Sequence, residues 1–214
     1  MNEISLHNVV PNVFSQRHDL HSDIWGREVA LRRGGIYLVE AASGTGKSSL
    51  CSFIIGQRRD YAGSISFDGR DVRTLSTTEW STLRQRHLSI LFPELRLFPE
   101  LTAWENVQLK NQLTHFRPDA VVAQWFDVLG IADKRDSLVG MMSFGQQQRV
   151  AFVRALLQPF DFLLIDEPIS HLDDDNAQRM SQLILDEARS RGAAVVATSI
   201  GKHLPLPYQQ TFSL

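Results

Sequence analysis

A run of small residues between two apolar stretches constrains the fold of this chain more than any other feature. The run covers residues 41–49, Ala-Ala-Ser-Gly-Thr-Gly-Lys-Ser-Ser, and follows the apolar residues 36–39. Residues 36–39 predict a buried strand, and residues 47–55, followed by Gly56, predict a helix. A strand, a small-residue loop and a helix together form a cradle, in which backbone N–H groups and the positive helix N-terminus bind phosphate.

The run matches the pattern G-x-x-x-x-G-K-[ST] except at its first position, where Ala41 replaces glycine. Alanine disfavours positive φ, so the departure is mild if this residue has ordinary backbone angles. The pattern predicts that Lys47 contacts the β- and γ-phosphates of a nucleotide and that the Ser48 hydroxyl binds Mg²⁺. The alternative is a simple turn between strand and helix. The predicted nucleotide-binding residues are Ala42, Ser43, Gly44, Thr45, Gly46, Lys47, Ser48 and Ser49.

Length and composition are those of one globular domain. The chain has 214 residues, of which 43% are hydrophobic and 21% are charged. The formal net charge of −2 argues against a nucleic-acid partner. The single cysteine, Cys51, excludes an internal disulfide framework and is expected in the core. No apolar run approaches the roughly 18 residues of a membrane span, so we expect a cytoplasmic protein that reaches a membrane only through a partner.

Strand and helix patterns fill the rest of the chain. Short β-like segments occupy residues 1–38, and capping boxes begin helices at Ser76 and Thr102. The helical stretch 93–157 is an insertion within one α/β core that comprises residues 1–92 and 158–214. His18 and His21 are better explained by a solvated loop than by a metal site, because no further ligand is near them in sequence. The other predicted elements are strands at 63–70, 87–92, 160–165, 193–197 and 211–214 and helices at 119–129, 143–157 and 176–191.

Two carboxylates follow the apolar strand predicted at 160–165. Asp166 comes directly after the strand, and Glu167 lies one residue further out. A carboxylate at a strand end is suited to hold Mg²⁺ beside a phosphate cradle, and its neighbour is suited to polarise a water against the γ-phosphate. Asp166 is therefore the second predicted metal ligand and Glu167 a predicted catalytic residue. The alternative is an acidic pair that caps a turn.

A second anion site is predicted at the start of the helix at 143–157. Residues 142–149 read Met-Ser-Phe-Gly-Gln-Gln-Gln-Arg, so a serine hydroxyl and exposed N–H groups precede the helix. One subunit cannot easily bring two such sites to the same phosphate, whereas a second subunit can. The residues expected to act on a partner's nucleotide are Ser143, Phe144, Gly145 and Gln146.

Together these motifs resemble those of the ATP-binding cassette (ABC) ATPases, over nearly all of the chain. Residues 41–49 resemble the Walker A loop, 142–146 the Leu-Ser-Gly-Gly-Gln signature, 162–166 the Walker B strand, and 170–173 the D-loop, which ends at Asp173. The chain is most similar to small cassettes of the lipoprotein-release, macrolide-export and cell-division class. The resemblance implies a P-loop NTPase (RecA-like) α/β core with an N-terminal antiparallel β subdomain and an inserted α-helical subdomain.

The resemblance also implies ATP and Mg²⁺ as cofactors and an ATPase that drives an integral membrane permease-type partner from the inner face of the cell membrane. It implies a head-to-tail homo- or heterodimer that encloses two ATP molecules. It places Phe14 where family members stack an aromatic ring on adenine. Phe14 is somewhat far from Lys47 in sequence, and a core position is the alternative.

Three positions depart from the family pattern. Pro93 stands in place of a glutamine and offers neither amide donor nor amide oxygen to Mg²⁺ or water, which leaves Glu94 as an alternative oxygen ligand if the loop shifts. Ser199 stands in place of a catalytic histidine and is uncharged, with His203 as the alternative. Phe144 replaces a glycine, so its side chain must point away from the phosphate. A slowly hydrolysing or non-hydrolysing nucleotide switch is therefore the second hypothesis.

Overall fold

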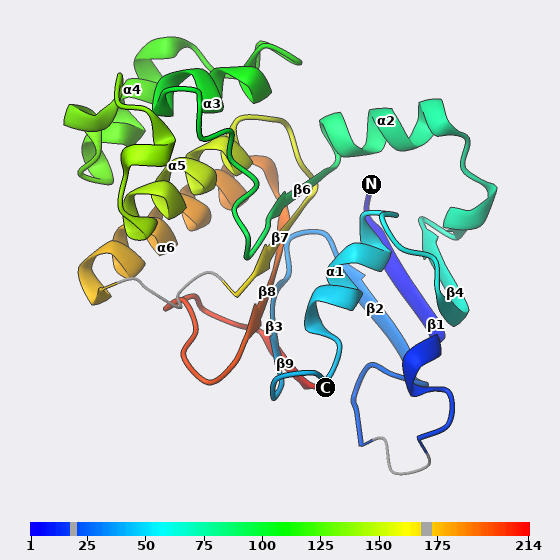
Figure 1. Ribbon diagram of the computed structural model, residues 1–214. Helices are drawn as coiled ribbons and strands as arrows, with labels where there is room; N and C mark the ends of the chain where they lie inside the picture. The colour runs from blue at the N-terminus through cyan, green and yellow to red at the C-terminus, as the bar shows by residue number, and fades with distance from the viewer. Residues whose placement is uncertain (18–20, 168–172) are drawn as a thin grey trace.

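The structure is a computed structural model that describes residues 1–17, 21–167 and 173–214 and contains two β-sheets (Figure 1). The first sheet is antiparallel, with the strand order β2-β1-β4-β5. It confirms the predicted N-terminal antiparallel subdomain. Its strands are β1 (Glu3–Pro11), β2 (Glu28–Arg32), β4 (Tyr61–Phe67) and β5 (Arg70–Asp71).

The second sheet is parallel, with the strand order β6-β7-β8-β3-β9. Its strands therefore end at one edge, where the loops that follow β3, β6, β7 and β8 come together. This edge carries the candidate site. The strands are β3 (Ile36–Glu40), β6 (Leu88–Leu91), β7 (Phe162–Asp166), β8 (Ala194–Ser199) and β9 (Gln210–Ser213).

The helices begin and end where local sequence signals predict. The capping boxes at Ser76 and Thr102 are both formed, and Gly192 ends α6 in the left-handed conformation, with a φ of 59°. The α-helices are α1 (Lys47–Ile54), α2 (Thr77–Arg86), α3 (Ala103–Asn111), α4 (Asp119–Val128), α5 (Phe144–Leu156) and α6 (Asp174–Arg191). Short 3-10 helices are η1 (Asn12–Phe14), η2 (Val72–Thr74), η3 (Ala132–Lys134) and η4 (Val139–Met141).

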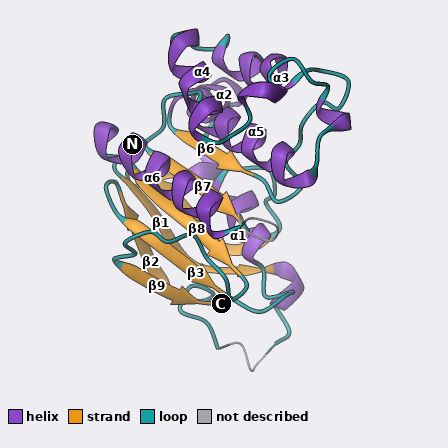
Figure 2. Ribbon diagram, turned by 90° about the vertical axis from the view of Figure 1, so that its left-hand side faces the viewer, coloured by secondary structure: helices purple, strands orange, loops and turns teal. Residues whose placement is uncertain are grey.

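Two hydrophobic cores lie on opposite faces of the parallel sheet. One face, which includes Leu164 and Val196, packs with α1 and the antiparallel sheet, and Cys51 lies in this core with 1% of its surface exposed. The other face, which includes Leu163 and Val195, packs with α6 and with α3, α4 and α5. Figure 1 shows α1 on one side of the parallel strands and α5 and α6 on the other. Figure 2 shows α3 and α4 at one end of the molecule.

The helical insertion at 93–157 has no core of its own. Its buried side chains, such as Val122 and Phe126, belong to the same cluster as the sheet residues Leu163 and Ile165. The helices α3 to α5 are therefore held in place by the sheet that carries the candidate site. No helix in the described part of the chain combines the length and apolar character that crossing a bilayer requires.

Candidate nucleotide-binding site

The loop between β3 and α1 packs against the core at Gly46 and is exposed to solvent at residues 42–44. Gly46 is the N-cap of α1 with a φ of 103°, and this residue provides no side-chain cap. A Cβ atom at Gly46 would lie 3.1 Å from ring atoms of both Phe14 and Trp25. Only glycine combines this backbone angle with this close approach. The first N–H groups of α1 are therefore left for a ligand, as a phosphate cradle requires.

Lys47 folds back over the loop. Only 4% of its surface is exposed, and its Nζ donates to the carbonyl oxygens of Ala42 at 2.8 Å and Ala41 at 3.3 Å. The same nitrogen lies 3.5 Å from Oε1 of Glu167. A buried ammonium group requires such oxygen partners. The charge is therefore already positioned at the cradle, between the loop and the end of β7.

Two aromatic rings support the loop from the core. The Nε1 of Trp25 donates to the carbonyl oxygen of Thr45 at 3.0 Å, and Oγ1 of Thr45 donates to the carbonyl of Ala42 at 2.8 Å. Sequence reasoning missed Trp25, because an isolated aromatic residue carries no signal of its contacts. Phe14 is only 5% exposed and packs beside Gly46. Its burial favours the core alternative over the predicted stacking on adenine.

Asp166 lies at the end of β7 and is 2% exposed. It faces Thr198 across the parallel register of β7 and β8, and Oγ1 of Thr198 donates to its Oδ1 at 2.6 Å. Burial raises the pKa of Asp166, and hydrogen bonds from Thr198 and Ser48 act in the opposite direction. The nearby charges of Glu167 and Glu94 raise it further. The carboxyl group of Asp166 is thus buried beside other carboxylates, and the sequence analysis did not predict its bond from Thr198.

These oxygen donors fit Mg²⁺. The Ser48 hydroxyl lies close enough to Asp166 to lower the pKa of its carboxyl group, so a hydroxyl and a carboxylate oxygen lie near one another. Mg²⁺ prefers oxygen ligands and is usually held by one or two carboxylates together with substrate phosphates. Within the described residues, no group of three or more His, Cys, Asp or Glu side chains is placed to hold a metal. The protein thus offers Mg²⁺ a small ligand set that a nucleotide would have to complete.

Glu167 has an unusual backbone conformation. Its φ is 51°, in the left-handed region, and its N–H donates to Oγ1 of Thr198 at 3.2 Å. Its side chain is 32% exposed, so it reaches both Lys47 and solvent. Non-glycine residues in this region are uncommon and gather at functional sites. The conformation turns Glu167 towards the cradle, where its predicted role as a catalytic residue requires it.

At two of the three positions that depart from the family pattern, the polar side chains that could act in place of the usual group form local contacts. Ser199 is 1% exposed, and its Oγ donates to the carbonyl oxygen of Lys202 at 2.5 Å. The Nδ1 of His203 lies 3.7 Å from Oε1 of Glu40. Glu94 is exposed and pairs with Arg96 at 2.6 Å. The predicted catalytic role of Ser199 stays a prediction, because its hydroxyl is turned to its own loop.

The signature residues form a separate cap at the start of α5. Oγ of Ser143 accepts from the N–H of Gln146 at 3.4 Å, and Oε1 of Gln146 accepts from the N–H of Ser143 at 3.0 Å. Phe144 is 43% exposed, and Gly145 follows it in the first turn of the helix. Asp173 caps α6 by accepting from the N–H of Asn176 at 2.8 Å. The other D-loop residues, 170–172, and His18 lie outside the described residues.

Comparisons with known proteins agree with this architecture. The family model described as ABC transporter matches residues 26–170. An uncharacterized ABC transporter ATP-binding protein of Mycobacterium tuberculosis is 31% identical over 213 residues, which cover 96% of this chain. The chain spans only 63% of the length of that relative. The lipoprotein-releasing system ATP-binding protein LolD 1 of Rhodospirillum rubrum is 32% identical over 193 residues, which cover 88% of this chain and 85% of that protein.

The fold is also found among solved structures. The dimeric structure of MJ0796, a bacterial ABC transporter cassette, has a TM-score of 0.78 to this chain at 24% identity. The match covers 92% of this chain and 87% of that one. It confirms the predicted P-loop NTPase fold.

Proposed function

The chain belongs to the ABC transporter family, and we propose that it is the ATP-binding and ATP-hydrolysing subunit of an ABC transporter-type membrane complex. One observation carries this proposal: the chain folds so that Lys47, Ser48, Asp166 and Glu167 converge where β3 and β7 end. Each group has a use in phosphoanhydride hydrolysis, which depends almost entirely on positioning and charge stabilisation.

Each group of residues in the site would have a different role in hydrolysis. The open N-terminus of α1 and the loop N–H groups bind the phosphates, and Lys47 exchanges its bonds to the Ala41 and Ala42 carbonyls for phosphate oxygens. Ser48 and Asp166 would hold Mg²⁺, which neutralises charge on the β- and γ-phosphate oxygens when bound. Glu167 orients and deprotonates the attacking water.

The signature residues would act on the nucleotide of a second subunit. Ser143, Phe144, Gly145 and Gln146 lie at the start of α5, apart from the cradle of their own chain. A head-to-tail dimer, homo- or heteromeric, would bring this helix start to the partner's γ-phosphate, with Asp173 at the dimer contact. Similarity to a lipoprotein-releasing system protein supports a membrane permease partner at the inner face of the membrane. In this arrangement residues 93–157 serve as the helical subdomain, and the remainder serves as the β subdomain and core.

A second function is favoured by the environment of Ser199. Its buried hydroxyl is bonded to Lys202, and proline occupies position 93, so two groups that usually sense the γ-phosphate are replaced. Such a subunit would bind ATP and close as a dimer but would hydrolyse ATP slowly or not at all. It would act as a switch rather than as a motor.

Steady-state ATP hydrolysis by the purified protein tests both functions, with ATP binding measured separately. Glu167→Gln should reduce turnover by about a hundredfold or more and retain binding, because it removes the base and keeps the shape. Ser199→His serves as the comparison. Turnover in the parent that is lost in Glu167→Gln supports the motor. Binding without turnover, with activity gained in Ser199→His, supports the switch, and absence of ATP binding contradicts both.

A further inference from the structure

One arginine of α5 binds the loop that follows β6. Arg154 donates from Nη1 to the carbonyl oxygen of Arg96 at 2.7 Å and from Nη2 to that of Leu95 at 2.6 Å. Burial lowers the pKa of Arg154 to about 10. The half-buried guanidinium has these two carbonyl oxygens as hydrogen-bond partners in place of water. The bonds therefore tie α5 firmly to the loop.

The loop that Arg154 holds has an unfavourable backbone conformation. Leu95 and Arg96 are consecutive residues with positive φ, 59° and 51°, and neither is glycine. L-residues avoid this region because Cβ crowds the backbone. The carbonyl groups that accept from Arg154 belong to the same two residues. The hydrogen bonds thus offset the strain where it occurs.

Two further contacts shape the loop. The Leu95 side chain is 4% exposed and belongs to the core shared with α5. The Arg96 guanidinium lies 3.6 Å from the centre of the Phe92 ring and pairs with Glu94. Arg96 thus contacts both the Phe92 ring and the Glu94 carboxylate, which connects the conformation of residues 95–96 to the position of Glu94.

The loop after β6 lies beside Asp166, one of the two predicted Mg²⁺ ligands. Leu91 pairs with Ile165 in the parallel register of β6 and β7, so the residues after β6 run beside Asp166. Among the charged and polar groups that shift the pKa of Asp166, Glu94 has the smallest effect and raises it. A displacement of the loop would therefore change both the charge and the shape around the predicted metal ligands.

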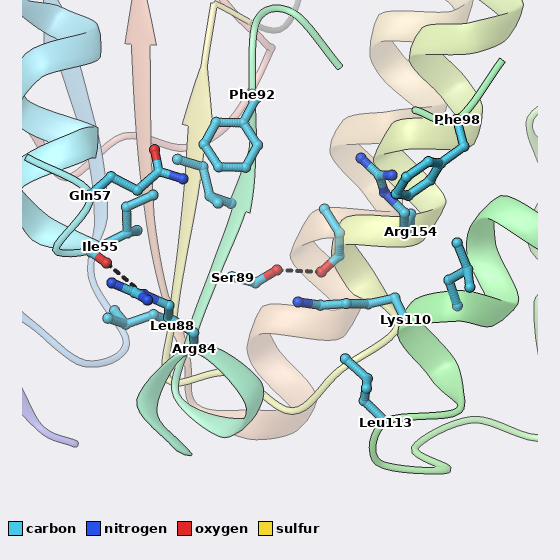
Figure 3. A pocket seen from close by; sticks show the side chains of 13 residues that line it. Ile55, Gln57, Arg84, Leu88, Ser89, Phe92, Phe98, Lys110, Leu113 and Arg154 are labelled. Atoms are coloured by element: carbon cyan, nitrogen blue, oxygen red, sulfur yellow. Dashed lines mark hydrogen bonds between the residues drawn. The ribbon is translucent and has the colours of Figure 1, made fainter. Parts of the chain in front are cut away.

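Arg84, on the opposite side of a groove from Arg154, makes the same kind of contacts with backbone carbonyl oxygens. The groove has a volume of about 380 Å³ and lies between the core and the helical insertion. Figure 3 shows Arg84 and Ile55 on one wall and Arg154 and Lys110 on the other. Arg84 also donates to two backbone carbonyl oxygens, of Ile55 at 2.9 Å and Gly56 at 3.1 Å, and burial lowers its pKa. Arg84, however, binds the loop after α1, on the far side of the groove from α5.

We propose that Arg154 is a positioning residue for the ATP site. It holds the strained loop after β6 beside Asp166 and ties the metal affinity of the site to the position of α5, the helix that begins at Ser143. The inference rests on the proposed ATP binding and does not depend on hydrolysis. It names a residue that touches neither the nucleotide cradle nor the predicted metal ligands.

The test compares the parent protein with Arg154→Met, Arg154→Lys and Arg84→Met. A fluorescent ATP analogue is titrated at a series of Mg²⁺ concentrations, and thermal unfolding is recorded for each protein. Arg154→Met should raise the Mg²⁺ concentration for half-maximal analogue binding by up to about tenfold, the lower end of the effect of groups bonded directly to metal ligands, because Arg154 acts through the loop. Binding in EDTA should stay within about twofold, because the cradle is untouched. The Mg²⁺ requirement of Arg154→Lys should lie between those of the parent and of Arg154→Met, because an ammonium group lacks the forked donors that reach both carbonyl oxygens.

Arg84→Met is the matched control for a purely structural role. It should lower the unfolding temperature and leave the Mg²⁺ requirement unchanged, because its loop is remote from Asp166. The proposal is overturned if Arg154→Met and Arg84→Met have the same Mg²⁺ requirement, or if analogue binding by the parent is independent of Mg²⁺. If Arg154→Met does not fold, the Mg²⁺ requirement of Arg154→Lys decides the matter in the same way. A parent that binds the analogue without hydrolysing ATP removes the proposed motor function and leaves this test intact.

Discussion

The starts of α1 and α5, the two helix N-termini predicted to meet phosphate, differ in how their N–H groups are satisfied. At α1 the N-cap is Gly46, with a φ of 103° and no side-chain cap. At α5 the N-cap is Ser143, whose side chain and that of Gln146 close a capping box. The first helix start has no side-chain cap, whereas at the second the capping box satisfies the N–H groups of Ser143 and Gln146 within the chain.

This difference indicates how far each helix start is satisfied before a nucleotide binds. A serine cap stabilises a helix by about 1 kcal/mol relative to alanine, and a glycine cap gives up part of that energy. The chain therefore forgoes stability at α1 in exchange for backbone N–H groups that need not leave a side-chain cap before ATP enters. At α5 the Ser143 hydroxyl accepts from the N–H of Gln146 and keeps its own O–H to donate to a phosphate, so the cap and a contact with a second subunit's nucleotide are compatible.

The open start of α1 should be the more sensitive of the two to a single methyl group. Gly46→Ala places a Cβ atom 3.1 Å from the rings of Phe14 and Trp25 at a φ of 103°. We expect it to lower the free energy of unfolding by roughly 1–3 kcal/mol. We expect ATP affinity to fall more than about tenfold, because the cradle must distort. Urea unfolding and an ATP titration measure the two effects.

Gly44→Ala is the control for this substitution. Gly44 also has a positive φ, 81°, but a Cβ atom there would meet nothing within 4 Å. Its effect on stability should be smaller, since only backbone strain is added. If Gly46→Ala binds ATP as tightly as the parent, the close packing beneath the loop has no role in shaping the cradle.

The closed start of α5 should show a different pattern, with a smaller loss of stability and a separate loss of turnover. Ser143→Ala should lower the free energy of unfolding by about 1 kcal/mol, as loss of a serine cap does. Turnover should fall by about tenfold, because a hydrogen bond to a charged phosphate is worth about 1.5 kcal/mol. ATP affinity of the single subunit should not change. Unfolding, ATP titration and steady-state hydrolysis separate these effects.

Ser76→Ala tests whether that loss of turnover is specific. Ser76 also forms a capping box, with Glu79 at the start of α2. The two variants should lose similar stability, and only Ser143→Ala should lose turnover. Equal turnover in both variants would mean that Ser143 serves only as a cap.

Most elements were predictable because their signals are local. The run of β-branched and apolar residues at 36–39 became β3, and the capping boxes at Ser76 and Thr102 formed as expected. The same pattern at Ser143 and Gln146, S-x-x-Q, was also present in the sequence. We interpreted Ser143 and Gln146 as phosphate-binding residues only, whereas the structure shows that they also cap α5.

The contacts that adjust the site could not be predicted, because they join residues distant in sequence. Thr198 meets Asp166 only through the pairing of β7 with β8, and Arg154 reaches the Leu95 carbonyl from another element. Neither Thr198 nor Arg154 stands out from the pattern of its own strand or helix. The direction of the Ser199 hydroxyl, towards Lys202, likewise depends on the path of the following loop. Residue type predicted the chemistry of this site, whereas topology determined which partners each group meets.

The smallest expected effect comes from charge, because the capping box of α2 contains Glu79 where that of α5 contains the uncharged Gln146. Glu79 accepts from the N–H of Ser76 at 2.8 Å and pairs with Arg70 at 2.5 Å, whereas Gln146 occupies the same place in α5 without a charge. The hydrogen bond from Arg70, followed by those from Ser76, lowers the pKa of Glu79 from 4.5 to about 2. Its contribution to stability is therefore present above pH 4.5 and is lost as the pH falls towards 2.

Thermal unfolding of the parent and of Glu79→Gln, recorded from pH 7 to pH 3, tests this assignment. The variant should unfold at a slightly lower temperature at pH 7, since an exposed ion pair contributes little. The difference should narrow below pH 4.5, because protonation of the parent's Glu79 removes the same interactions. Gln146→Glu should acquire a pH dependence of its own at α5, where the parent has none to lose. A difference between parent and Glu79→Gln that is constant over this range would show that the carboxylate charge does not strengthen the cap and that the two boxes are equivalent.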